Sequence, residues 1–324
     1  MKKTFLYFCL LFIVQTAFAA DSLYVREQQI PILIDRIDNV LYEMRIPAQK
    51  GDVLNEITIQ IGDNVNLSDI QAIRLFYSGV EAPSRKGEHF SPVTYISSHI
   101  PGNTRKALES YSVRQDEVTA PLSRTVKLTS KQPMLKGINY FWVSIQMKPE
   151  TSLLAKVATT IPNAQINNKP IDITWKGKVD ERHVGIGVRQ AGDDGSAAFR
   201  IPGLVTTNNG TLLGVYDIRY NSSVDLQEKI DIGVSRSTDK GQTWEPMRVA
   251  MTFKQTDGLP HGQNGVGDPS ILVDEKTNTI WVVAAWTHGM GNERAWWNSM
   301  PGMTPDETAQ LMLCLLYTSP SPRD

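Results

Sequence analysis

The sequence predicts an all-β protein with an N-terminal antiparallel β-sandwich and a second β-rich segment. Between residues 21 and 180, polar and apolar side chains alternate in short runs, which is the pattern of half-buried strands. Clusters of Gly, Pro and Asn separate these runs, as they do between the strands of a sandwich. Helical periodicity is sparse, and only residues 32–42 are ambiguous between helix and strand.

The expected strands follow in order along both segments. In the first segment they lie at residues 57–61, 124–128, 140–147 and 171–175. Charge and glycine replace the hydrophobic pattern after residue 175, which predicts a domain boundary near residue 180. The second segment, residues 181–313, alternates at 203–205, 211–216, 230–234 and 279–286. Asn208-Asn209-Gly210 predicts a type I′ hairpin turn, and hairpins of this spacing suit a sandwich or a propeller equally well.

Residues 1–19 have the pattern of a secretory signal peptide. Lys2 and Lys3 precede an apolar run from residue 4 to 14, and an Ala-x-Ala sequence follows. The run is shorter than the ~20 apolar residues that span a bilayer, so no stable membrane insertion is expected. The pattern predicts an exported protein, periplasmic or extracellular.

The other end, residues 314–324, resembles a translated sequencing adapter, with a natural Ser/Pro-rich tail as the alternative. We therefore expect that the genuine protein continues beyond Leu313. Just before this tail, residues 304–307 could cap a helix, but residues 310–313 favour a strand.

Composition excludes several function classes. The 324 residues suit two domains, and a formal net charge of -1 gives no basic excess for nucleic acid. The two cysteines, Cys9 and Cys314, exclude a disulfide framework and a thiolate metal cluster. The five histidines lack ligand spacing, so we expect no cofactor and place no metal site.

A turn motif of known form follows the expected strand at 230–234. Its residues fit the pattern Ser-x-Asp-x-Gly-x-Thr-Trp, the Asp-box, formed by Ser237, Asp239, Gly241, Thr243 and Trp244. The serine and aspartate can accept bonds from backbone amides, the glycine permits a positive φ, and the tryptophan can pack beneath the hairpin. The motif is structural rather than catalytic.

The run from Phe199 to Pro202, Phe-Arg-Ile-Pro, precedes this Asp-box, and the combination resembles the bacterial sialidases (neuraminidases). The resemblance implies that residues 181–313 form the first blades of a six-bladed β-propeller. It also implies that residues 20–180 form the accessory β-sandwich domain found in sialidases of gut bacteria.

The resemblance also implies roles for individual residues. Arg200 and Arg219 match two members of an arginine triad that binds the substrate carboxylate, a role that suits planar guanidinium groups. Asp225 matches the catalytic acid/base, which a partly dry site would keep protonated, although an ordinary loop aspartate is the alternative. Asp268 matches a pocket carboxylate that contacts a sugar amide or hydroxyl, with an Asp-Pro turn as the alternative.

Other family residues cannot be placed on this sequence. They are a tyrosine nucleophile, its glutamate partner and a third arginine, and Tyr317 lies in the suspect tail. Trp286 could belong to an acyl pocket or to the core, and Trp296 and Trp297 could form an exposed platform or pack within the propeller.

The function implied is that of an exo-α-sialidase, which hydrolyses terminal sialic acids with retention of configuration. Its partners would be sialylated glycoproteins, glycolipids or oligosaccharides, and neither nucleic acid nor a membrane. The alternative is a non-catalytic Asp-box propeller or glycan-binding module. Residues 181–313 are enough for about two to three blades, so we expect the chain by itself to be inactive.

Overall fold

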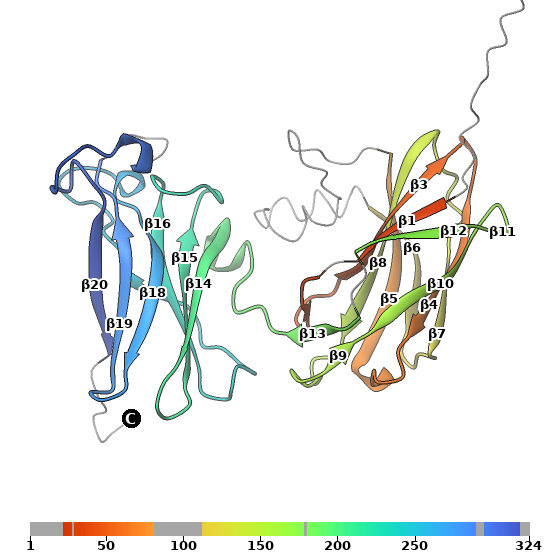
Figure 1. Cartoon of the computed structure of the whole chain (residues 1–324), viewed down its shortest axis with the longest axis horizontal. Coiled ribbons are helices and arrows are strands. Elements are labelled where there is room, and N and C mark those ends of the chain that lie inside the picture. Colours follow the sequence, from red (N-terminus) through yellow and green to blue (C-terminus); the bar gives the residue numbers. More distant parts are fainter. Residues whose placement is uncertain (1–21, 28, 81–111, 178–179, 290–294, 318–324) are drawn as a thin grey trace, which may run out of the picture.

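A computed structural model describes residues 22–27, 29–80, 112–177, 180–289 and 295–317, and it confirms the all-β class. The expected signal peptide and residues 318–324 lie outside this range. Figure 1 shows two groups of strands, one from each half of the chain. The described helices are single 3-10 turns, none of which is long and apolar enough to cross a membrane: η1 (Leu67–Asp69), η2 (Asp193–Gly195), η3 (His261–Gln263) and η4 (Ala295–Asn298).

The N-terminal unit is a sandwich of two main sheets. The first has the order β12-β1-β3-β8-β5-β6, with β1 (Ser22–Glu27), β3 (Asn39–Ala48), β5 (Ile70–Gly79), β6 (Val113–Thr119), β8 (Gly137–Met147) and β12 (Asp172–Lys176). The second has the order β11-β10-β4-β7, with β4 (Leu54–Ile61), β7 (Thr125–Thr129), β10 (Thr159–Ile166) and β11 (Lys169–Pro170).

Alternating side chains build the core between these sheets. Ile57, Ile59 and Ile61 of β4 are fully buried and belong to one cluster with Val143 and Ile145 of β8. Each such side chain contributes about 1.5–3 kcal/mol by leaving water. The predicted sandwich is confirmed, although β1 and β12 pair in parallel, a feature that alternation does not encode.

A small third sheet joins β2 (Ile32–Leu33), β9 (Lys156–Val157) and β13 (Arg182–Gly185). The ambiguous residues 32–42 therefore enter strands β2 and β3 and form no helix. Arg182, 3% exposed, donates to the carbonyls of Ile30 at 2.9 Å and Val40 at 2.6 Å. Strand pairing of the N-terminal unit thus reaches Gly185.

The C-terminal unit contains two antiparallel meanders whose strands pair in chain order. One consists of β14 (Ala198–Thr206), β15 (Leu212–Arg219), β16 (Ile230–Ser237) and β17 (Arg248–Met251). The other consists of β18 (Val266–Asp274), β19 (Thr279–Trp286) and β20 (Gln310–Tyr317). Their facing side chains share one core, and meanders of this kind are the blades of propellers. The total of six blades stays a prediction.

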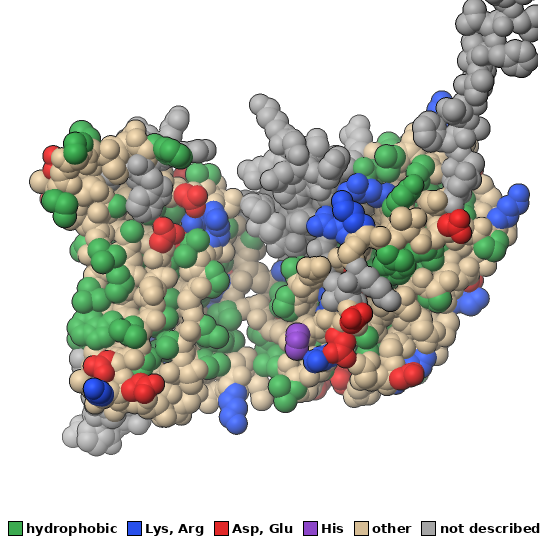
Figure 2. Space-filling model, viewed as in Figure 1, with side chains coloured by type: hydrophobic (Ala, Val, Ile, Leu, Met, Phe, Trp, Pro, Cys, Tyr) green, Lys and Arg blue, Asp and Glu red, His purple; other side chains and the backbone are tan. Residues whose placement is uncertain are grey.

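Strand β20 confirms the strand expected at residues 310–313 and continues to Tyr317. Cys314 and Leu316 pack against the shared core, while the alternate positions face outward. Leu311, Leu313 and Leu315 are 79%, 61% and 45% exposed. Hydrophobic side chains accordingly gather on this side of the unit (Figure 2).

Turn geometry differs from the prediction at one hairpin. Between β14 and β15, only Gly210 has a positive φ, so the expected type I′ turn at residues 208–210 is wrong. The Gly210 amide bonds to the Thr207 carbonyl at 2.9 Å, which makes a type I turn followed by a left-handed glycine. A two-residue loop with positive φ at both positions occurs instead at Asn167 and Asn168, between β10 and β11.

The Asp-box forms the turn that follows β16. The Asp239 carboxylate accepts the Ser237 hydroxyl at 2.8 Å and the Thr243 amide at 2.9 Å. Ser237 in turn accepts the Gly241 amide at 2.8 Å, and Gly241 has a φ of 86°. The Thr243 hydroxyl also donates to Asp239, and this bond, followed by those from the Thr243 amide and the Ser237 hydroxyl, lowers the pKa of Asp239 to about 2. The Trp244 ring, half-buried, lies against Gly214 of the neighbouring strand.

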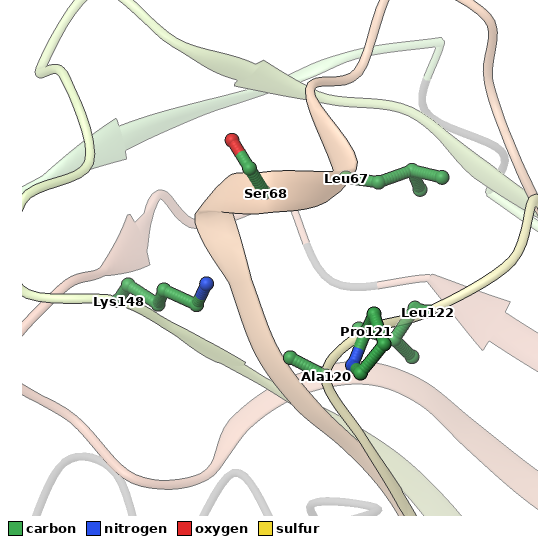
Figure 3. Close-up of a pocket in the computed structure, with 6 residues that line it drawn as sticks. All are labelled: Leu67, Ser68, Ala120, Pro121, Leu122 and Lys148. Carbon is green, nitrogen blue, oxygen red and sulfur yellow. The ribbon is translucent and has the colours of Figure 1, made fainter.

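A pocket of about 460 Å³ lies in the N-terminal unit (Figure 3). It is lined by η1, the segment 120–122 and Lys148. All of the residues predicted to act on a ligand lie elsewhere, in the C-terminal unit.

Candidate active site

Arg200 lies near the start of β14, beside a bulge between that strand and β15. Ile201 within the bulge has a φ of 52°. The Arg200 side chain is 43% exposed, and its Nη1 donates to the Ser223 carbonyl and to Asp225 Oδ1, both at 3.0 Å. Arg200 is therefore a cation at the surface of the site.

Arg219 ends the neighbouring strand β15 and is buried, at 1% exposed. Its Nη1 donates to the Ser223 carbonyl at 2.9 Å and to Asp225 Oδ1 at 2.7 Å. Its other edge donates to Asp217 Oδ2, from Nε at 3.1 Å and from Nη2 at 2.7 Å. The guanidinium group is thus held from two sides.

Asp225 receives both arginines on a single oxygen, and its side chain is 63% exposed. The hydrogen bond from Arg219 and the charges of both guanidinium groups hold its pKa below the usual range. The expectation that a partly dry site keeps Asp225 protonated is therefore wrong for this structure. The carboxyl group is instead an exposed carboxylate because two cations stabilise its charged form.

Gln227, which the sequence does not mark, fixes the loop that carries Asp225. It is 4% exposed, and its amide nitrogen donates to the Thr287 carbonyl at 2.9 Å. Its Oε1 accepts the Thr287 hydroxyl at 2.9 Å and the Gly265 amide at 3.3 Å. These bonds join the loop to the β18 and β19 hairpin.

Asp217 is a second site residue that the sequence interpretation missed. It is 1% exposed and, besides Arg219, it binds the Asp268 amide, which donates to Oδ1 at 2.9 Å. Burial raises the pKa of Asp217 to about 6, while both of these bonds oppose the rise. A signal was available, because residues two apart on a strand share a face and Asp217 precedes Arg219 by two positions.

Asp268 lies at a bulge in β18 and has a φ of 56°. Its side chain is exposed, and its backbone amide faces Asp217. The structure therefore brings Arg200, Arg219, Asp225 and Asp268 to one region, with Asp217 behind them.

Of the remaining candidates, one belongs to the core and another is exposed at the surface. Trp286 is 8% exposed, stacks on Phe253 with ring centroids 4.6 Å apart and belongs to the core cluster. Trp297 is 76% exposed, whereas the side chain of Trp296 lies outside the described part. His261 and His288 contact Asp231 and Asn264, each at 2.8 Å. Among the described residues, no group of three or more His, Cys, Asp and Glu side chains is placed to hold a metal ion.

Comparison with known proteins finds similar proteins for both halves of the chain. Residues 20–170 match the family model of the N-terminal domain of BNR-repeat neuraminidases. A sialidase of Bacteroides fragilis is 56% identical over 97% of this chain and 58% of its own length. A sialidase of Paraclostridium sordellii is 34% identical over 35% of this chain and 26% of its own length.

The solved structures agree with the sequence comparison. A Hadza microbial sialidase superposes with a TM-score of 0.75 at 60% identity, over 90% of this chain and 56% of that one. The chain thus spans a little more than half the length of the first relatives that it matches. Over nearly all of its own length, the chain is similar in sequence and fold to microbial proteins named sialidase, and its residues 20–170 match the model of the N-terminal domain of BNR-repeat neuraminidases.

Proposed function

We propose that the protein of which this chain is a part is an exo-α-sialidase that removes terminal sialic acids from glycoproteins, glycolipids or oligosaccharides. The observation that carries the proposal is the convergence of Arg200 and Arg219 on one carboxylate oxygen, at 3.0 and 2.7 Å. The similarity to proteins named sialidase supports it.

Two guanidinium groups that already bind a carboxylate form a site for a second carboxylate of similar shape. Sialic acids differ from neutral sugars by such a group. Arg200 is the exposed member of the pair and would meet the ligand first, while the buried Arg219 lies behind it. A ligand carboxylate would compete with Asp225 for the same donors.

This competition gives Asp225 a route to the role of general acid. Once a ligand carboxylate takes the arginine donors, the interactions that lower the pKa of Asp225 are weakened, so its pKa rises. A carboxyl group with a raised pKa can then deliver a proton to the leaving oxygen. Asp268, exposed beside this cluster, would accept a hydrogen bond from a hydroxyl or amide of the sugar.

The test is the release of a fluorescent aglycone from a sialoside by the complete product of the gene. The matched substrate is the methyl ester of the same sialoside, which lacks the charge that Arg200 would bind. Cleavage of the acid but not of the ester is expected, and equal cleavage of both would contradict the carboxylate site. The anomer first released, followed by proton NMR, reports whether configuration is retained.

Asp225→Ala separates the acid role from binding. A leaving group that needs no protonation should still be cleaved by this variant, whereas an alkyl sialoside should lose at least about 100-fold in rate, the usual contribution of general acid catalysis. An equal loss for both substrates would refute the acid role.

A glycan-binding module without catalysis remains the second candidate. The observation that favours it is the geometry of Asp225, whose exposed side chain makes ion pairs with both arginines and thus suits charge balance better than proton transfer. If the complete gene product binds a sialoside but does not cleave it, the result supports the glycan-binding module.

A further inference from the structure

Asp217 joins the two hairpins that supply the site. Its Oδ2 binds the Nε and Nη2 atoms of Arg219, at the end of the β14 and β15 hairpin. Its Oδ1 accepts the Asp268 amide at 2.9 Å, at the start of the β18 and β19 hairpin. One buried carboxylate therefore contacts both a cation and a backbone segment of the site.

The contact with Arg219 leaves that side chain little choice of direction. Two of its three nitrogens face Asp217, so Nη1 is the nitrogen that reaches the loop of Ser223 and Asp225. A guanidinium group held along one edge is pre-organised, and little side-chain entropy is lost when it binds an anion.

The contact with Asp268 supports a strained backbone. A non-glycine residue with a φ of 56° costs of order 1 kcal/mol or more, and the structure around it must compensate. The adjacent Gly267 packs closely on the Asp217 carboxylate, since a Cβ at this position would lie 3.4 Å from both of its oxygens. The bulge that presents the Asp268 side chain to solvent thus rests on Asp217.

We propose that Asp217 is a positioning residue of this site: it orients the Arg219 guanidinium and fixes the bulge that presents Asp268, and it does not contact the ligand. The inference rests on the proposed function only in naming the ligand as a sialoside. The bonds that Asp217 makes within the protein are independent of that function.

The direct variant is Asp217→Asn, which has the same shape but only one acceptor oxygen. That oxygen cannot serve both Arg219 and the Asp268 amide in the observed geometry. Asp231→Asn is the matched control, because Asp231 is also buried on the same sheet, at 2% exposed. Its partners are Tyr220 at 3.0 Å and His261 at 2.8 Å, outside the proposed site.

The first readout is the Arg219 Nε–H resonance in the chain itself, assigned by its loss in Arg219→Lys. We expect Asp217→Asn to shift this resonance or speed its exchange with water at least ten-fold, and Asp231→Asn to leave it unchanged. An unmoved resonance in Asp217→Asn would overturn the proposal. Asp217→Glu keeps the charge but moves it by one methylene group, and it decides the point by the same signal if Asp217→Asn does not fold.

The second readout is steady-state cleavage of a fluorogenic sialoside by the complete gene product. Asp217→Asn should lower kcat/KM at least ten-fold, mostly through KM, while Asp231→Asn should stay within two-fold of the unaltered protein. Equal losses in both variants would reduce Asp217 to a structural role and overturn the proposal. Absence of cleavage by the unaltered protein would refute the sialidase function, and the resonance would still decide the positioning claim.

Discussion

Replacement of Gln227 by leucine should loosen the loop that carries Asp225. The leucine side chain fills similar space but leaves two buried backbone groups, the Thr287 carbonyl and the Gly265 amide, without their present partner. The Thr287 hydroxyl keeps a longer contact with the Gly265 carbonyl, at 3.4 Å. At ~1–3 kcal/mol for each buried group that loses its partner, we expect a loss of about 3 kcal/mol in the free energy of unfolding.

Urea unfolding followed by tryptophan fluorescence measures this loss, and hydrogen exchange of residues 221–229 locates it. Gln242→Leu is the control, because Gln242 is exposed within the Asp-box and its replacement should change stability by less than about 0.5 kcal/mol. Two results would contradict the role of Gln227 in fixing the loop. One is a loss below about 1 kcal/mol for Gln227→Leu, and the other is hydrogen exchange in the loop equal to that of the control.

Three further perturbations have defined outcomes. Gly233→Ala should cost about 1–3 kcal/mol in urea unfolding, because a Cβ there would lie 2.5 Å from the Tyr216 ring; an unchanged midpoint would contradict this packing. Leu313→Lys should raise the concentration at which the chain scatters light, since it breaks the exposed apolar row on β20, and an unaltered threshold would show that the row is harmless. The raised pKa of Asp217, about 6 against 3.8, means that the folded state holds this proton more tightly, so its contribution to stability falls as pH rises from about 4 to 6. We therefore compare the free energy of unfolding of the unaltered protein with that of Asp217→Asn. The difference between them should fall by up to about 3 kcal/mol as pH rises over this range and stay constant above it. A difference that rises with pH would contradict the assigned sign.

Alternation predicted most strands because burial on one face of a sheet imposes a period of two. It could not predict the parallel pairing of β1 with β12, since the direction of a partner strand leaves no trace in the pattern of either strand. The Asn-Gly sequence predicts a type I′ turn at residues 208–210, yet Asn-Gly sequences also occur in type I turns followed by a left-handed glycine, and hairpin register decides between the two.

In the site, too, residue types predict some of the functional side chains, whereas others depend on tertiary packing. Arg200, Arg219, Asp225 and Asp268 were identified from a resemblance, and the structure brings them together. Gln227 could not be predicted, because its bonds to Thr287 and Gly265 span 60 and 38 residues. The lowered pKa of Asp225 depends first on Arg219, which is six positions away, and on the direction in which that side chain points. The contact of Asp217 with Arg219 could be predicted, because the two residues share one face of a strand. Its second bond, to the Asp268 amide, could not, because it spans 51 residues.

The charges of the site explain why binding of an anion must change the contacts or the protonation of its acidic side chains. Arg200 and Arg219 face two carboxylates, Asp217 and Asp225, so with all four groups ionised the cluster is neutral before any ligand binds. A further carboxylate would add a charge that the cluster cannot balance, unless an acid takes up a proton or moves into water. Asp217 is buried and bound on both oxygens, whereas Asp225 is exposed and bound through one. Asp225 is therefore the group that moves away from the arginines into water, whereas Asp217, whose pKa burial raises to about 6, is the acid that more readily takes up a proton.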